Sequence, residues 1–140
     1  MSKSLNRSKV TLRNAKNDLL YLNDDDAYLD DCCYNTQQSI EFVLKYLVEL
    51  TGVSYVMSHD IRAQLNKLSK DIPYFDKLWL MAPTINSWED NSRYKDNFVA
   101  LRQDVDEAIA IAEALISYAE SLSEPTTPRE SSIFNSLPQR

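Results

Sequence analysis

The chain has 140 residues, a length that suits one compact domain whose core needs no disulfide or metal cross-links. Its formal net charge of −6 and its pI near 4.7 argue against broad, charge-driven binding to nucleic acid or to an anionic membrane, although a local basic patch is compatible with both values. The sequence has no apolar run long enough to cross a bilayer, and its first ten residues lack the apolar centre of a secretory signal. We therefore expect a cytoplasmic protein without membrane contact, in which the adjacent Cys32 and Cys33 are reduced thiols.

The sequence predicts an all-α fold. Turn residues that a sheet would need are scarce, because Gly52 is the only glycine and no proline precedes Pro73. A first helix is predicted over residues 5–22, where apolar side chains recur at helical spacing. These are Leu12, Ala15, Leu19 and Leu22.

A second, long helix is predicted from Asp26 to Gly52. The aspartates at its start complement the positive end of the helix dipole, and Gly52 suits a left-handed C-cap. A shorter third helix follows over residues 59–70, with Ser58 as its N-cap and a partly buried apolar stripe.

The last third of the chain holds two further helical patterns. Residues 74–90 carry apolar side chains at helical spacing, but Pro83 should split this stretch into two short pieces because it removes a backbone donor and clashes with the preceding turn. From Lys95 to Leu122 the apolar residues recur at alternating spacings of three and four, which predicts a long helix that packs along a neighbouring helix. We therefore expect an up-and-down bundle of four to five helices over residues 1–122.

The C-terminal residues 123–140 differ in composition from the helical domain. They are rich in Pro, Ser and Thr, which cannot supply a core of their own. We expect a mobile tail unless Ile133, Phe134 and Leu137 dock on the bundle.

A polar stripe runs along the second predicted helix, in the stretch "YNTQQSIEFVLKYLVELTG". At about 100° per residue, Gln37, Gln38, Glu41 and Lys45 share one narrow face between apolar shoulders. Two interpretations remain open for this stripe. It is either a structural network with a favourable Glu41 to Lys45 pair, or a cleft whose amide, carboxylate and ammonium groups bind a nucleotide or another polar ligand.

The same stretch resembles the central-helix signature of HEPN domains (higher eukaryotes and prokaryotes nucleotide-binding). In that family a pair of glutamines is followed by a glutamate and a lysine at the spacing found here. Two further pieces follow in the same order as in the family. One is Gly52 with the His-Asp-hydrophobic triplet that begins at His59, and the other is the pair Arg93 and Tyr94 before the last helix. The resemblance covers most of residues 5–122 and implies a small helical bundle that commonly dimerises.

The ribonuclease signature of many HEPN domains is absent from this chain. That signature is an arginine, a polar residue and then a histidine a few positions later, and the histidine moves protons during cleavage. The only histidine here is His59; the stretch "GVSYVMSH" that ends in it has no arginine, and "YKDNFVALR" after Arg93 has no histidine. The resemblance therefore implies a non-catalytic or motif-degenerate member, with an atypical metal-independent ribonuclease that uses Arg93 with Tyr94 or His59 as the alternative.

The candidate ligand-binding residues are those that the resemblance includes: Gln38, Glu41, Lys45, His59, Arg93 and Tyr94. For His59 the competing interpretation is a local bond that orients the loop, and for Arg93 and Tyr94 it is a salt bridge and packing at a helix entrance. The expected ligand is a nucleotide or RNA. The resemblance also implies protein partners, namely a second copy of the chain and a minimal nucleotidyltransferase in a toxin–antitoxin pair.

A second feature of the sequence also predicts homodimerisation. Phe42 and Tyr46 are predicted to point away from the buried stripe of the second helix, and an exposed aromatic surface of this kind is typical of an interface. A basic strip of Lys9, Arg13 and Lys16 on the first helix is interpreted as a solvated face rather than an RNA contact. No metal and no cofactor are predicted, because the chain has only one histidine and two neighbouring cysteines, so the ligands of a classical zinc site would have to come from scattered carboxylates.

Overall fold

The computed structural model describes residues 3–21, 26–52, 58–94 and 101–123. It contains five helices: α1 (Lys3–Leu20), α2 (Asp26–Leu50), α3 (Ile61–Leu65), α4 (Phe75–Tyr94) and α5 (Arg102–Ser123). The described ranges contain no strand, so the predicted all-α bundle is confirmed. The predicted tail falls on residues 124–140, which lie outside the described part.

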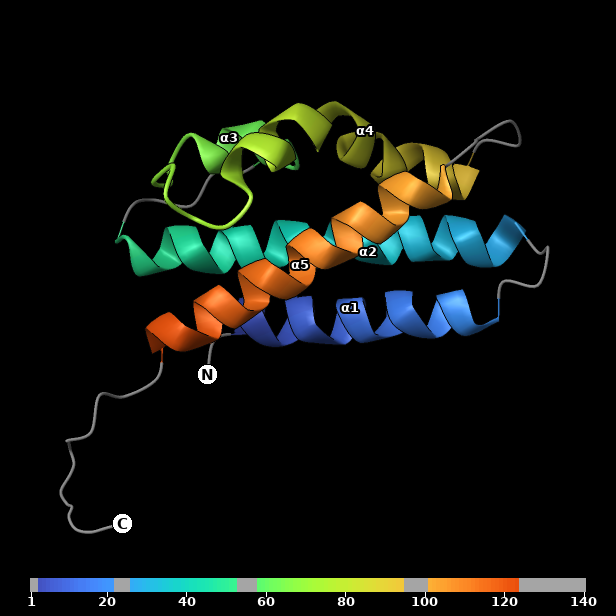
Figure 1. The fold of residues 1–140 in the computed structure, drawn as a ribbon, viewed down its shortest axis with the longest axis horizontal. Helices are drawn as coiled ribbons and strands as arrows, with labels where there is room; N and C mark the ends of the chain where they lie inside the picture. Colours follow the sequence, from blue (N-terminus) through green and yellow to red (C-terminus); the bar gives the residue numbers. More distant parts are fainter. Residues whose placement is uncertain (1–2, 22–25, 53–57, 95–100, 124–140) are drawn as a thin grey trace, which may run out of the picture.

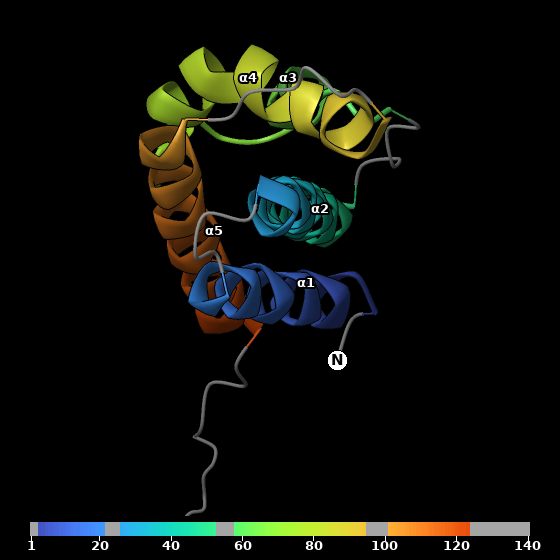
Figure 2. The same cartoon turned by 90° about the vertical axis from the view of Figure 1, so that its right-hand side faces the viewer.

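The central helix of the bundle is α2. Figure 2 shows it nearly end on, with α1 on one side, α3 and α4 on the other, and α5 along one flank. In Figure 1, α1 and α2 run side by side over most of their lengths while α5 crosses them obliquely. Because α2 has neighbours on several sides, its buried apolar residues extend over more than one face. They include Ile40, Val43, Leu44, Leu47 and Val48.

The C-terminus of α2 follows the prediction. The helix ends at Leu50, and Gly52 adopts a φ of +76°, a left-handed conformation that residues with a Cβ rarely take. Tyr46, however, was wrongly expected at the surface, because it is buried in the core. Phe42 is only half-buried and lies beneath the Arg7 guanidinium, 5.7 Å from its ring centre.

The sequence predicted Ser58 as the N-cap of α3, but the N-cap is Asp60. The Asp60 carboxylate accepts the backbone N–H of Arg62 at 3.0 Å, whereas the Ser58 hydroxyl accepts the N–H of Asp60 in a turn that precedes the helix. The helix is also shorter than predicted, since the backbone hydrogen bonds donated by Lys67 and Leu68 span three residues instead of four.

Pro83 lies inside one continuous helix, so the predicted split of this element is wrong. A proline cannot donate to the carbonyl four residues earlier, which here belongs to Trp79. That carbonyl instead accepts the Arg62 Nε–H at 2.9 Å, and the Arg62 guanidinium also lies 5.0 Å from the Trp79 ring centre. The side chain from α3 replaces the missing helical donor, and Pro83 itself is exposed, so α4 continues past the proline.

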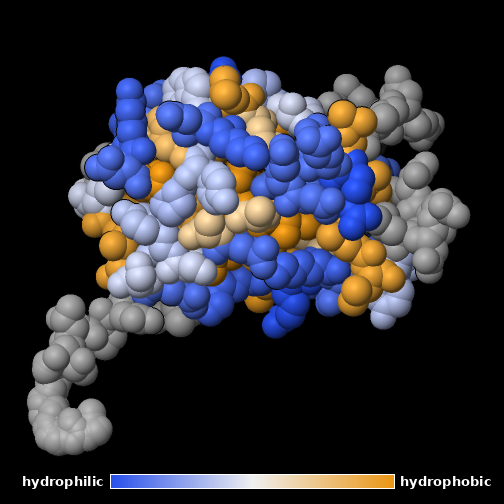
Figure 3. Space-filling model, viewed as in Figure 1, coloured by the Kyte–Doolittle hydropathy of each residue, from blue (hydrophilic) through white to orange (hydrophobic). Residues whose placement is uncertain are grey.

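The last helix begins at Arg102, and its predicted apolar stripe is buried from Val105 to Ala119. Leu101 and Leu122, which share the predicted stripe, are exposed, and the predicted start of the helix at Lys95 lies outside the described residues. Figure 3 shows that apolar areas on one face of the molecule are interrupted by hydrophilic side chains. None of the described helices combines the length and apolar character needed to span a bilayer.

Candidate functional site

The polar stripe of α2 forms a connected network of hydrogen bonds. The Gln37 side chain is fully buried, and its amide donates to Glu41 Oε1 at 3.1 Å. The Gln38 amide donates to Gln37 Oε1 at 2.8 Å and approaches Glu41 Oε1 at 3.5 Å. Buried polar groups of this kind are stable only when paired, and here each amide is oriented by the next residue in the network.

Glu41 extends this network to two other elements of the fold. Its carboxylate is 7% exposed, and Oε2 lies 2.5 Å from Nδ1 of His59, which precedes α3. The same nitrogen lies 3.4 Å from Glu89 Oε1 on α4. The His59 side chain is 70% exposed and that of Glu89 is 23% exposed, so a buried carboxylate, an accessible imidazole and a second carboxylate converge at the surface.

An acidic pocket opens at this point of convergence. It has a volume of about 430 Å³ and is lined by His59, Asp60, Asn86 and Glu89. Asn86 holds its shape, since it accepts the backbone N–H of Ile61 at 3.1 Å and donates to the Asp60 carboxylate at 2.9 Å. Carboxylates dominate its charged lining, so the pocket suits a cation or a hydrogen-bond donor and disfavours a bare phosphate.

A second groove, of about 410 Å³, lies between α1 and α2 and has the opposite character. We call it the α1–α2 groove; its lining includes Lys3, Arg7, Gln38 and Phe42, together with Asn6, Val10 and Thr11. Among the residues that the structure describes, no carboxylate pairs with Lys3 or Arg7. The groove therefore combines two cations with an aromatic ring and an amide.

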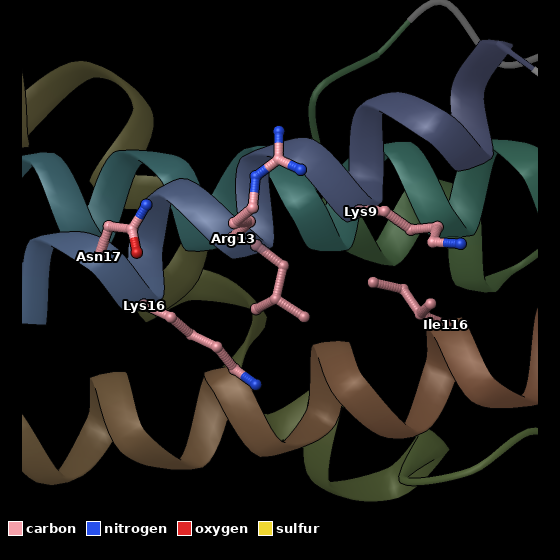
Figure 4. A pocket seen from close by; sticks show the side chains of 6 residues that line it. Lys9, Arg13, Lys16, Asn17 and Ile116 are labelled. Carbon is pink, nitrogen blue, oxygen red and sulfur yellow. The ribbon is translucent and has the colours of Figure 1, made fainter.

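A third groove, between α1 and α5, holds the basic strip predicted from the sequence (Figure 4). Lys9 pairs with Glu120 at 2.7 Å and Lys16 pairs with Glu113, so both lysines join α1 to α5. Arg13 extends away from α5 in Figure 4. Two of the three predicted basic side chains are thus partly neutralised by cross-helix ion pairs that the sequence pattern did not reveal.

The six candidate residues predicted from the sequence do not form one site. Gln38 lies on the α1–α2 groove, while Glu41 and His59 meet at the acidic pocket. Lys45 is half-buried on α2 and lines neither of the two. The backbone of Arg93 and Tyr94 belongs to the end of α4, and their side chains lie outside the described part.

Sequence patterns alone missed Glu89 in the acidic pocket and Lys3 and Arg7 in the groove. Glu89 carries no local signal, because it reaches His59, which precedes α3, through the packing of α4 against α3 and α2. For α1 a signal existed, since the helix contains five basic residues and one acidic residue within a chain of net charge −6. That contrast marks α1 as the positive element of an acidic protein.

The two cysteines are not candidate nucleophiles. Both are fully buried and form no disulfide, in agreement with the predicted reduced thiols. Burial raises the pKa of the Cys32 thiol to about 11, against a weaker lowering by its hydrogen bond with Thr36. Burial also raises the pKa of Cys33, so neither side chain supplies a thiolate near neutral pH.

Comparisons with known proteins agree with this architecture. The family model described as "HEPN domain" matches residues 1–122. Among solved structures, the chain is similar to the protein TT1696 from Thermus thermophilus, with 23% identity over 83% of this chain and 98% of that chain and a TM-score of 0.51, a likeness that shows the fold. A comparison with curated proteins finds no match. Since the family match spans nearly all of the helical domain, the chain belongs to the HEPN domain family.

Proposed function

We propose that this HEPN protein binds a nucleotide or short single-stranded RNA without cleaving it, and that the α1–α2 groove is the binding site. Family membership supports a function related to nucleotides or RNA in general. The observation that carries the proposal is the arrangement of Arg7 beside the Phe42 ring, with Gln38 and Lys3 in the same groove. Proteins that bind single strands combine these elements: cations for the phosphates and an aromatic face for a base.

The charges of α1 supply the phosphate contacts. Its five basic residues and one acidic residue give the helix a net charge of +4. Lys9 and Lys16 are already paired with glutamates of α5, whereas Lys3 and Arg7 have no such partner among the described residues. An arginine offers a planar fork of donors that matches phosphate geometry, so Arg7 is the principal phosphate ligand and Lys3 adds charge.

Phe42 and Gln38 supply the contacts to the base. The Phe42 side chain is half-buried, which fixes its ring while leaving part of it open to stacking. The Gln38 amide nitrogen is directed toward Gln37 and Glu41, and no described residue donates to its side-chain oxygen. That oxygen is therefore available to accept a hydrogen bond from the exocyclic amino group of a base.

The test is fluorescence anisotropy with a short labelled single-stranded RNA at low salt. Arg7→Gln and Arg13→Gln form a matched pair, because both remove one positive charge from α1 but only Arg7 lines the groove. We expect Arg7→Gln to weaken binding and Arg13→Gln to leave it nearly unchanged. Phe42→Leu should weaken binding by roughly 5- to 150-fold, the equivalent of the 1–3 kcal/mol typical of one stacked base.

Competition by free mononucleotides in the same assay separates a nucleotide site from an RNA site. Displacement at similar concentrations indicates a mononucleotide ligand, and failure to displace indicates that several phosphates are needed. Equal losses for Arg7→Gln and Arg13→Gln, or no binding by the wild-type protein, would refute the proposal.

The ribonuclease alternative is tested with the same RNA. Cleavage by the wild-type protein that disappears in Arg93→Ala would favour an atypical ribonuclease over a non-catalytic binder. The nucleotidyltransferase partner implied by the family resemblance stays a prediction.

A further inference from the structure

We propose that Glu41, His59 and Glu89 bind one divalent transition-metal ion, with Zn²⁺ as the preferred class. Each residue offers one ligand atom, and these three atoms lie within 4.8 Å of one another. They come from α2, from the turn before α3 and from α4, so the tertiary fold alone assembles the set. A nitrogen with two carboxylate oxygens is a donor set that zinc accepts, and three protein ligands leave a fourth position for water or another ligand.

The two distances that involve His59 fit such an ion after a small movement, and all three ligand atoms lie within 4.8 Å of one another. Ligands about 2.0 Å from a tetrahedral ion are separated from each other by roughly 3.3 Å. His59 Nδ1 already lies 3.4 Å from Glu89 Oε1, and its 2.5 Å separation from Glu41 Oε2 needs to widen by less than about 1 Å to reach the tetrahedral spacing. The His59 side chain is mostly exposed, so it can make this adjustment while the buried Glu41 stays in place.

Hydrogen bonds around the three residues orient them as outer-shell partners orient metal ligands. Gln37 donates to Glu41 Oε1 and leaves Oε2 directed toward His59. Behind His59, Asn86 holds the Asp60 carboxylate and the Ile61 N–H, which fixes the backbone that carries the imidazole. The acidic pocket of about 430 Å³ supplies a path for an ion from solvent.

The charges of the cluster also favour a divalent ion. A single proton on Nδ1 bridges at most two of these three groups, whereas one ion bonds to all three and balances the charge of both carboxylates. Mg²⁺ prefers an octahedral shell of oxygens, so the imidazole directs the choice toward zinc and similar ions. This proposal does not rest on the α1–α2 groove, because the two sites share no lining residue.

Calorimetric titration of the tag-free full chain with Zn²⁺ tests the site directly. We expect one site per chain, and a dissociation constant at least about tenfold weaker in Glu89→Gln and in His59→Gln, the lower limit of effects seen for groups around metal ligands. Glu113→Gln is the matched control, since it removes one surface carboxylate that pairs with Lys16 on the other side of the fold. Titration with Mg²⁺ should give a far weaker signal.

A second measurement uses the fact that His59 is the only histidine. Diethyl pyrocarbonate modifies accessible imidazoles, so the wild-type protein should react once and should be protected when Zn²⁺ is present. Protection should disappear in Glu89→Gln, whose fold is checked by circular dichroism. Absence of zinc binding by the wild-type protein, or binding and protection that survive in Glu89→Gln, overturns the proposal and leaves His59 in an ordinary ion pair.

Discussion

Replacement of Glu41 by alanine should destabilise the protein more than any exposed carboxylate replacement. The substitution removes the acceptor for the Gln37 amide, and Gln37 is fully buried, so its donor would be left unpaired at a cost of about 1–3 kcal/mol. It also breaks the contact with His59, but that side chain is 70% exposed and water can solvate it. The loss therefore stays below the roughly 3–5 kcal/mol that follows when a buried ion pair loses one partner. We expect a decrease in the free energy of unfolding of about 2–3 kcal/mol.

The measurement is urea unfolding followed by circular dichroism, in the presence of a chelator so that no metal ion contributes. Glu113→Ala is the control because that carboxylate is 47% exposed in its pair with Lys16, and exposed pairs contribute about 0–1 kcal/mol. The midpoint of unfolding should shift while its slope stays constant, as expected when only the stability of the native state changes.

The result that would refute this reasoning is a loss for Glu41→Ala no larger than that for Glu113→Ala. Such an outcome would mean that water reaches the Gln37 amide in the native protein, and that the polar stripe of α2 is an open cleft. A double-mutant cycle with His59→Ala measures how much of the loss belongs to the Glu41 to His59 contact alone.

Three other predictions concern the rest of the molecule. Arg62→Met should cost about 1–2 kcal/mol of stability because it removes the donor to the Trp79 carbonyl, and the cost should shrink in a Pro83→Ala background, where a helical N–H is restored. Burial raises the pKa of the Cys32 thiol from 9.0 to about 11. The protonated thiol therefore contributes stability that is complete below pH 9 and is lost as the pH rises toward 11. Between these pH values, the urea midpoint of Cys32→Ala should fall less than that of the wild-type protein. HEPN domains often dimerise, and light scattering should give about twice the 16.1 kDa chain mass; a mass that stays at one chain on concentration contradicts this.

Helical periodicity predicted the order of the helices because each apolar stripe reports on a single element. Where the prediction failed, either a side chain from another element or the path of the backbone decided the outcome. Pro83 is tolerated because Arg62 supplies a donor to the carbonyl that the proline leaves unpaired, and no pattern within residues 74–90 contains that information. Ser58 and Asp60 are equally good caps by type, and only the backbone path shows that Asp60 holds the position.

The site was less predictable than the fold for the same reason. The helical wheel placed Gln37, Gln38 and Glu41 together, and the structure keeps them within one network. It could not show that Gln38 lines the groove with α1 while Glu41 meets His59 before α3, because the division depends on which elements cover each edge of the stripe.

Burial of the polar stripe has a desolvation cost, so a gain in stability does not explain why these polar residues are buried. Gln37 and Glu41 are both buried, and their desolvation would be avoided by apolar residues of similar volume, an exchange that is often neutral or stabilising in protein cores. The network holds side chains in fixed positions. Gln37 donates to the Glu41 carboxylate, which meets His59, and its side-chain oxygen accepts a hydrogen bond from the Gln38 amide, which orients Gln38 at the opposite edge of the stripe. A buried network with an ordered polar group at each of two surfaces is expected when those surfaces bind ligands, because binding is strongest when the contacting groups are held in place beforehand. The opposite charges of the two surfaces agree with the two proposals, which place an anionic ligand beside α1 and a cationic one beside α4.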